Sequence, residues 1–201
     1  MTGLSALLEE VRTCRLCAAH LPLGPRPVVQ LHEAAPILII GQAPGTKVHE
    51  TGIPFNDPSG DRLRDWLGVD RETFYDPTKI ALMPSGFCYP GRSLKGGDLP
   101  PRKECAPHWH PRLRPHLAGV RLTLLVGQYA QALYLGKARK RTLGETVQAW
   151  QDYLPDVWPT PHPSWRVNLW LKKNPWFEAD ALPALRTRVR DLLADLVKDT
   201  T

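Results

Sequence analysis

The sequence predicts an α/β fold, a three-layer α/β/α sandwich around a small, mainly parallel central sheet of four strands. Short apolar runs alternate with longer segments of helical periodicity, the pattern of strands joined by helices that cover a sheet. Gly or Pro follows the apolar runs, so each strand is expected to end in a turn. The chain has 201 residues, of which 42% are hydrophobic, enough for one core. We therefore expect a single domain over residues 1–201.

The N-terminal half is expected to contain two helices and two strands. Residues 5–12 have apolar side chains on one helical face, with Ser5 as the expected N-cap. Residues 36–40 (PILII) are continuously apolar and mostly β-branched, which is typical of a parallel strand buried on both faces. The Gly- and Pro-rich loop that follows occupies the place where α/β sheets bind ligands. Residues 59–67 are then expected to form a helix that starts with serine, and residues 80–83 the second strand.

The C-terminal half continues the alternation of strands and helices. We expect strands at residues 120–126 and 157–160, and helices at residues 128–135 and 142–153. Residues 177–197 carry an apolar stripe at helical spacing, which predicts a long helix packed on the sheet. The stripe consists of Leu182, Leu185, Val189, Leu192, Leu193 and Leu196.

The charge of the chain favours a polyanionic partner. There are 26 Lys and Arg residues against 20 Asp and Glu residues, a formal net charge of +6. Such an excess attracts phosphates, although an ordinary basic surface is equally compatible with it. No apolar run reaches the roughly 18 residues that a membrane span needs, and the N-terminus does not resemble a signal peptide. We therefore expect a cytoplasmic protein that does not bind membranes.

Cysteine spacing is the strongest chemical signal in the sequence. The chain has four cysteines, Cys14 and Cys17 in a C-x-x-C hairpin, then Cys88 and Cys105. The hairpin can present two thiolates to one metal centre, and the fold must bring in the other two. Spacing alone leaves three alternatives open: disulfides or buried thiols, a tetrahedral zinc site, or an iron–sulfur cluster.

Two loops carry further candidate residues. Residues 41–45 (GQAPG) directly follow the first strand, and residues 52–55 and 59–60 add glycines that allow close backbone approach to a ligand. Residues 160–166 (TPHPSWR) hold His162 between two prolines. Taken separately, the first loop is compatible with a plain strand-to-helix turn, and His162 with a structural role.

Taken together, these segments resemble the uracil-DNA glycosylase superfamily, most closely its iron–sulfur branch, family 4. The resemblance rests on the GQAPG loop, a variant of the family's G-E-A-P-G, on the G-x-P-F step at residues 52–55 and on GQYA at residues 127–130. It also includes the H-P-S motif at residues 162–164, all four cysteines and the order of elements. The resemblance covers nearly the whole chain.

The resemblance implies a fold of this superfamily, a base pocket and a 4Fe-4S cluster held by Cys14, Cys17, Cys88 and Cys105. In that pocket Phe55 stacks on the extruded base. His162 bonds the base O2 and stabilises the negative charge that develops on the leaving base. The substrate-binding residues implied are Gly41, Gln42, Ala43, Pro44, Gly45, Phe55, Ser85 and His162.

The resemblance also implies where DNA is held. Ser164, Trp165 and Arg166 occupy the positions at which the family inserts residues into the minor groove. Ser59 and Gly60 are expected to face a DNA phosphate at a helix N-terminus. The expected partner is DNA that contains uracil or another deaminated base, bound by a monomer.

Two departures from the family pattern concern the chemistry. The family has an acidic residue where this chain has Gln42, whose neutral amide orients water but takes no proton from it. Three residues of the same loop are possible substitutes, with Asp57 ranked before Glu50 and His49. Dissociative cleavage also relies less on a base than on stabilising the leaving group. We therefore name His162, Gln42 and Asp57 as the catalytic candidates.

The second departure concerns specificity. The family has Asn four residues before its third cysteine, where it reads the Watson–Crick edge of uracil, and this chain has Pro84. The Ser85 hydroxyl or a backbone amide is the expected replacement. The loop between Cys88 and Cys105 (YPGRSLKGGDLPPRKE) also lacks the Arg-rich, His-bearing insertion of the branch that bonds covalently to DNA.

Three functions are therefore compatible with the sequence. The leading hypothesis is a monofunctional glycosylase of base excision repair that hydrolyses the N-glycosidic bond of uracil or a related deaminated base. The alternative is an iron–sulfur protein that recognises DNA damage with little or no turnover. A zinc-stabilised nucleotide or phosphate enzyme is the third, although no P-loop lysine is present.

Overall fold

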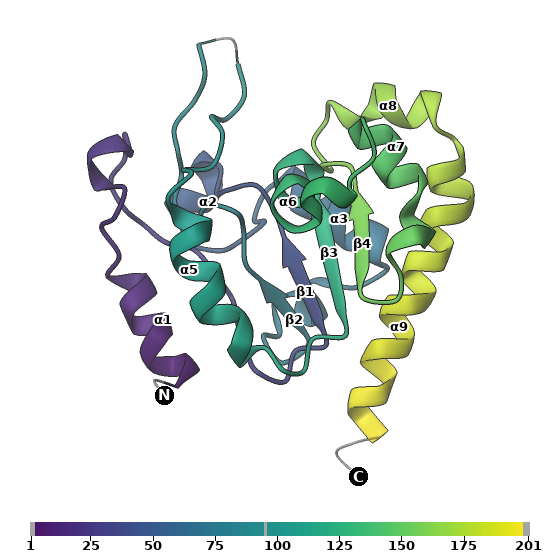
Figure 1. Ribbon diagram of the computed structural model, residues 1–201, viewed down its shortest axis with the longest axis horizontal. Helices are drawn as coiled ribbons and strands as arrows, with labels where there is room; N and C mark the ends of the chain where they lie inside the picture. Colours follow the sequence, from purple (N-terminus) through teal and green to yellow (C-terminus); the bar gives the residue numbers. More distant parts are fainter. Residues whose placement is uncertain (1–2, 95, 199–201) are drawn as a thin grey trace.

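A computed structural model describes residues 3–94 and 96–198 of the chain. Its centre is a four-stranded sheet of β1 (Ile37–Ile40), β2 (Ile80–Leu82), β3 (Leu122–Val126) and β4 (Val157–Thr160). The strands are arranged in the order β2-β1-β3-β4, and every pairing is parallel (Figure 1). The predicted α/β fold and all four predicted strands are confirmed.

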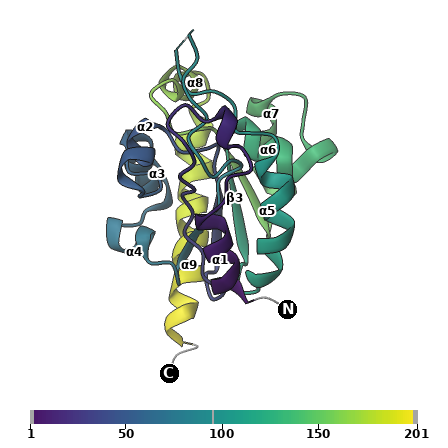
Figure 2. The ribbon, with the colours of Figure 1, turned by 90° about the vertical axis from the view of Figure 1, so that its left-hand side faces the viewer.

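Helices cover both faces of the sheet, which produces three layers (Figure 2). On one face lie α3 (Pro58–Leu67), α4 (Arg71–Tyr75) and α9 (Leu182–Lys198), and on the other α1 (Leu4–Arg12), α5 (Cys105–Leu113) and α6 (Gly127–Leu135). Alternate residues of β1 divide between the two layers. Ile37 and Ile39 pack with the first group, and Leu38 and Ile40 with the second. This explains why the strand is apolar at every position.

Several predicted helix boundaries are wrong. The N-cap of α1 is Gly3 and not Ser5, and α3 is capped by Asp57, two residues before the serine that was expected to begin it. The predicted helix at residues 142–153 is two elements, α7 (Leu143–Gln148) and a short 3-10 helix (Trp150–Tyr153).

The long C-terminal helix was predicted correctly in position but begins differently. Its first five residues, Phe177–Ala181, form a π-helical turn, and α9 follows without a break. The fully buried Phe177 lies in that turn, among the aromatic rings of Trp66 and Trp170.

Three helices were not predicted, namely α2 (Thr46–Thr51), α4 and α5. The first two are only six and five residues long. The third contains Pro111 in its interior, and proline is normally read as a helix breaker. A further helix, α8 (Val167–Lys173), follows the H-P-S loop as expected, and short 3-10 helices occur at Ala18–His20, Arg114–His116 and Gly136–Ala138. Within the described part of the chain, no helix is long and apolar enough to span a membrane.

The fold brings three loops to one edge of the sheet. Because all four strands are parallel, the loops after β1, β2 and β4 leave from the same edge. The loop after β1 is fixed by tight packing at Gly60, which is buried in the first turn of α3. A Cβ at this position would lie 1.7 Å from the Phe55 carbonyl oxygen.

This contact predicts that Gly60→Ala strongly destabilises the protein. No flexible side chain is available to move, since the obstructing atom belongs to the backbone of Phe55, which has a positive φ of 53°. We expect a loss of at least about 2 kcal/mol in the free energy of unfolding. Gly144→Ala is the control, because its nearest contact of 3.4 Å is ordinary; it should change stability by no more than about 1 kcal/mol. Equal denaturation midpoints for the two variants would contradict the role of Gly60.

Candidate functional site

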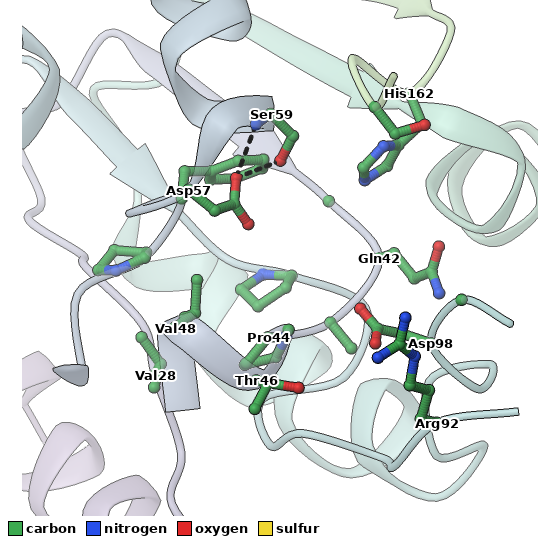
Figure 3. A pocket seen from close by; sticks show the side chains of 18 of the residues that line it. Val28, Gln42, Pro44, Thr46, Val48, Asp57, Ser59, Arg92, Asp98 and His162 are labelled. Carbon is green, nitrogen blue, oxygen red and sulfur yellow. Dashed lines mark hydrogen bonds between the residues drawn. The ribbon is translucent and has the colours of Figure 1, made fainter. Parts of the chain in front are cut away.

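A pocket of about 720 Å³ opens at the carboxyl edge of the sheet (Figure 3). Its walls come from the loop after β1, the start of α3, the loop between Cys88 and Cys105, and the H-P-S loop after β4. Most of the predicted site residues line it: Gly41, Gln42, Ala43, Pro44, Gly45, Phe55, Asp57, Ser59, His162, Ser164, Trp165 and Arg166.

Phe55 forms an aromatic wall against the backbone of Gly41. A Cβ at position 41 would lie 3.0 Å from Phe55 Cζ, so the ring sits where a side chain would otherwise be. On its other side the ring packs edge to face against Phe74, with centroids 6.1 Å apart. The flat ring is therefore held in position before any ligand binds, as a stacking surface requires.

Gln42 connects two walls of the pocket. Its Nε2 donates a hydrogen bond of 3.2 Å to the carbonyl oxygen of Leu99, in the loop between the third and fourth cysteines. Its backbone carbonyl accepts from the Gly86 amide at 2.9 Å. The side-chain oxygen remains as an acceptor that can orient water.

His162 lines the same pocket as Gln42 (Figure 3). Gly127 lies beside His162, and a Cβ at position 127 would be 3.2 Å from the His162 Cβ. Gly127 also has a φ of +83°, which favours glycine. Pro161 and Pro163 are both buried and fix the loop. Burial lowers the pKa of His162 below its ordinary value, and the charge of Asp57 acts in the opposite direction. The imidazole is therefore neutral at pH 7.

Asp57 has a structural task at the start of α3. Its Oδ1 accepts hydrogen bonds from the Ser59 amide, the Ser59 hydroxyl and the Gly60 amide. These are the donors that were expected to face a DNA phosphate. Ser59 lines the pocket but Gly60 does not. The phosphate contact of this pair stays a prediction, and in this structure the Asp57 carboxylate accepts from the donors concerned.

Ser85, predicted to read the base, is buried outside the pocket. Its amide and its hydroxyl both donate to the Gly41 carbonyl, at 2.9 and 2.8 Å. The residue that does line the pocket is Pro84. Ser85 therefore stabilises the loop after β1 and presents no donor to a ligand.

The carbonyl of Pro84 is also occupied. It lies 3.1 Å from Nε2 of the buried His110, which must donate because a carbonyl only accepts. His110 Nδ1 then accepts from the Tyr134 hydroxyl at 2.8 Å. Burial lowers the pKa of His110 to about 4, so the ring stays neutral. At position 84 the pocket wall thus offers a base neither a donor nor an acceptor.

Arg92 and Asp98 are pocket residues that the sequence analysis missed. Both belong to the loop between Cys88 and Cys105, where they pair in an isolated β-bridge. Asp98 is an exposed residue, but desolvation by the surrounding pocket atoms raises its pKa, and the nearby Arg92 opposes this. The available sequence signal was the position of the loop, since cysteines that return to one site force the chain between them back toward the fold.

Trp165 and Arg166 lie at the mouth of the pocket. The Trp165 side chain is 74% exposed, and the Arg166 guanidinium lies 5.4 Å from its ring centroid. Arg166 also touches the opposite wall, because a Cβ at Gly97 would lie 2.9 Å from one of its terminal nitrogens. A cation and a large exposed ring therefore border the opening on one side.

Residues 29–186 match the family model of the uracil DNA glycosylase superfamily. The chain belongs to this superfamily. Membership indicates a glycosylase-type hydrolase that binds DNA, and the pocket at the carboxyl edge of the sheet is where this superfamily member can receive a base. The matched segment includes the aromatic wall, His162 and the loop of Gln42.

The four cysteines of this superfamily member line a second, small cavity beside α5. None of them forms a disulfide. Trp109 Nε1 donates to Cys14 Sγ at 3.4 Å, and the Phe87 amide donates to Cys105 Sγ at 3.3 Å. Burial raises the pKa of Cys88 to about 11 and that of Cys105 to about 12, so buried thiolates here require a positive partner.

The four thiols are a donor set of the kind that a group held by four thiolates requires. Four thiolates on a single zinc lie roughly 3.8 Å apart, given a Zn–S bond of about 2.3 Å. Among residues 3–94 and 96–198, no three His, Cys, Asp or Glu side chains are arranged to hold a metal ion. All four thiols nevertheless face one cavity, as a four-cysteine cluster requires.

The electrostatics of the pocket predict the behaviour of His162. Because the Asp57 charge raises the pKa of His162 against the effect of burial, Asp57→Asn should lower that pKa further. The asparagine retains the helix cap, so the fold is expected to be kept. Histidine ring signals followed by NMR across pH, assigned with His162→Gln, measure the shift. Asp180→Asn, on an exposed residue outside the pocket, is the control. A His162 pKa that is unchanged or raised in Asp57→Asn would refute this coupling.

Proposed function

We propose that this protein is a monofunctional DNA glycosylase of the iron–sulfur family 4 branch, with GQAPG as a variant loop. It extrudes uracil or a related deaminated base from DNA and hydrolyses the N-glycosidic bond, acting as a single-domain monomer. The observation that carries the proposal is the convergence of Phe55, Gln42 and His162 on one pocket. Each comes from a different loop, and each supplies a different part of the chemistry.

Base binding begins with stacking. A flipped base that enters the pocket lies against the ring of Phe55, which recognises a flat heterocycle without loss of rotamer freedom. The exposed Trp165 and the cation of Arg166 at the mouth support the distorted duplex, with Trp165 as the residue that enters the minor groove. The net charge of +6 adds phosphate attraction that does not depend on sequence.

Cleavage depends on His162. As the C1′–N1 bond breaks, its electron pair moves to the base, and negative charge appears on the base O2. A neutral imidazole donates its N–H to that oxygen, so it acts where charge develops in the transition state. Burial keeps the ring neutral, since it lowers the pKa of His162. Gln42 holds the water that adds to C1′.

The iron–sulfur cluster is part of the proposal. Cys14, Cys17, Cys88 and Cys105 would hold it, and the two hydrogen bonds to sulfur and the shared cavity support this assignment. When bound, a 4Fe-4S group supplies positive charge and four covalent ties. The residues that enclose it join the N-terminal arm to α5 and to the loop that carries Asp98. Its proposed role is therefore to stabilise structure, away from the base pocket.

A catalytically weak damage-binding protein is the second candidate. It is favoured by Pro84, whose carbonyl is bonded to His110, and by the absence of a carboxylate at position 42. A pocket of this kind would retain an extruded base by stacking and shape, with little turnover.

We expect His162→Ala to reduce catalysis more than Gln42→Ala. Loss of one donor to a developing anion typically costs about 10²–10³ in rate, whereas Gln42 only positions water. Single-turnover excision is measured on oligonucleotides that carry uracil, hypoxanthine or xanthine, with melting temperatures for each variant. Excision by a normally folded His162→Ala at the parental rate would refute the assignment. An inactive parental protein that binds these oligonucleotides would favour the second candidate.

We expect protein purified without oxygen to be brown, with four iron atoms and no zinc per chain by elemental analysis. Cys17→Ala should lose iron, and its melting temperature should fall, because the thiolates would lose their shared partner. Any folded fraction should retain the parental single-turnover rate. Colourless protein with one zinc per chain would overturn the cluster assignment.

A further inference from the structure

The proposed reaction needs an acceptor for a proton, and Gln42 cannot serve. Water that adds to C1′ must lose a proton, and a carboxamide does not take one at neutral pH. Two carboxylates line the pocket, Asp57 and Asp98. The two carboxylates differ in their hydrogen bonds and in the loops that they contact.

Asp57 is the N-cap of α3. Its Oδ1 accepts three hydrogen bonds from Ser59 and Gly60 at the start of α3. Reorienting this side chain would uncap α3.

Asp98 lies against the loop that carries Gln42. Its Oδ2 is 3.2 Å from the position that a Cβ would occupy on Gly45, so the carboxylate rests on the backbone of the GQAPG loop. The next residue, Leu99, accepts the Gln42 side-chain hydrogen bond at 3.2 Å. The two side chains therefore belong to one connected wall of the pocket, and Figure 3 draws Gln42 between His162 and Asp98.

The loop holds Asp98 in this position from both sides. Asp98 forms a β-bridge with Arg92, and the Leu99 amide donates to the Gly91 carbonyl at 2.8 Å. Asp98 is an exposed residue whose side chain lines the pocket, so a bound water can reach its carboxylate. It is a better placed and less satisfied base than Asp57.

We propose that Asp98 is the general base of this glycosylase and replaces the acid that the loop lacks at position 42. The inference rests on the proposed function. A water held by Gln42 gives one proton to the Asp98 carboxylate, and its oxygen forms the bond to C1′. The C1′–N1 electron pair leaves with the base, whose charge His162 stabilises, and the proton on Asp98 passes to the released base or to solvent. The products are the free base and the abasic site, and only water is consumed.

Four groups influence the charge of Asp98. Arg92 on its own loop lowers its pKa, and Asp57 across the pocket raises it. Arg166 lies beside Gly97, and the neutral His162 faces the same cavity. Desolvation in the pocket is the largest effect on the pKa of Asp98 and raises it. The rate should therefore fall on the acid side at a pH above the ordinary Asp pKa of about 3.9.

The test uses the full chain and single-turnover excision across pH, on whichever base the parental protein removes. Asp98→Asn should reduce the rate by about 10²-fold or more and remove the acid limb. Its affinity for DNA should stay within about threefold, and its melting temperature should not fall, because an amide of the same shape replaces a carboxylate on an exposed residue. Asp57→Asn should remain within about tenfold of the parental rate, and Asp180→Asn should match it.

A double variant separates base catalysis from a purely structural effect. Gln42→Glu in the Asp98→Asn background places a carboxylate on the adjoining wall, and we expect it to recover at least about tenfold of the lost rate. If the parental protein is active and Asp98→Asn excises within about threefold of the parental rate, the role of Asp98 is refuted and the proposed function stands. A parental protein inactive on every base tested overturns the proposed function, and the role of Asp98 with it.

Discussion

The burial of β1 on both faces is the constraint on which the rest of the structure depends. All four of its residues are fully buried, and it pairs in parallel on both sides, with β2 and β3. The pocket opens beyond the carboxyl end of this strand. There Gly41 admits the ring of Phe55, and its carbonyl accepts two hydrogen bonds from Ser85. The aromatic wall and the loop of Gln42 are thus fixed by the same few backbone atoms.

The charges in the pocket depend on the hydrogen bonds and the burial of each polar side chain. Asp57 is bonded to the first turn of α3, and Gln42 to the carbonyl of Leu99. His162 is kept neutral by burial. Arg92 and Asp98 enter from a loop that packs over the opening. Groups restrained before ligand binding need little reorganisation during a reaction, which is the physical basis of electrostatic preorganisation.

Base recognition in this superfamily member must rely on something other than residue 84. Pro84 has no amide hydrogen, and its carbonyl is bonded to His110, which is itself bonded to Tyr134. The ring of Phe55 and the imidazole of His162 still line the pocket. Under the proposed function, stacking on Phe55 does not depend on which deaminated base is bound, which accords with a broader choice of base than uracil alone.

The sequence by itself determined the fold class, the four strands and most of the pocket, because apolar periodicity and local motifs such as GQAPG and H-P-S act over short stretches. Tertiary structure decided which polar groups are free. No local pattern indicates that the Ser85 hydroxyl donates to the carbonyl of Gly41, or that Asp98 returns to the pocket more than 50 residues after the loop that it contacts. Hydrogen bonds and contacts between distant segments exist only once the chain is folded, and they determine which donors and acceptors are left for chemistry.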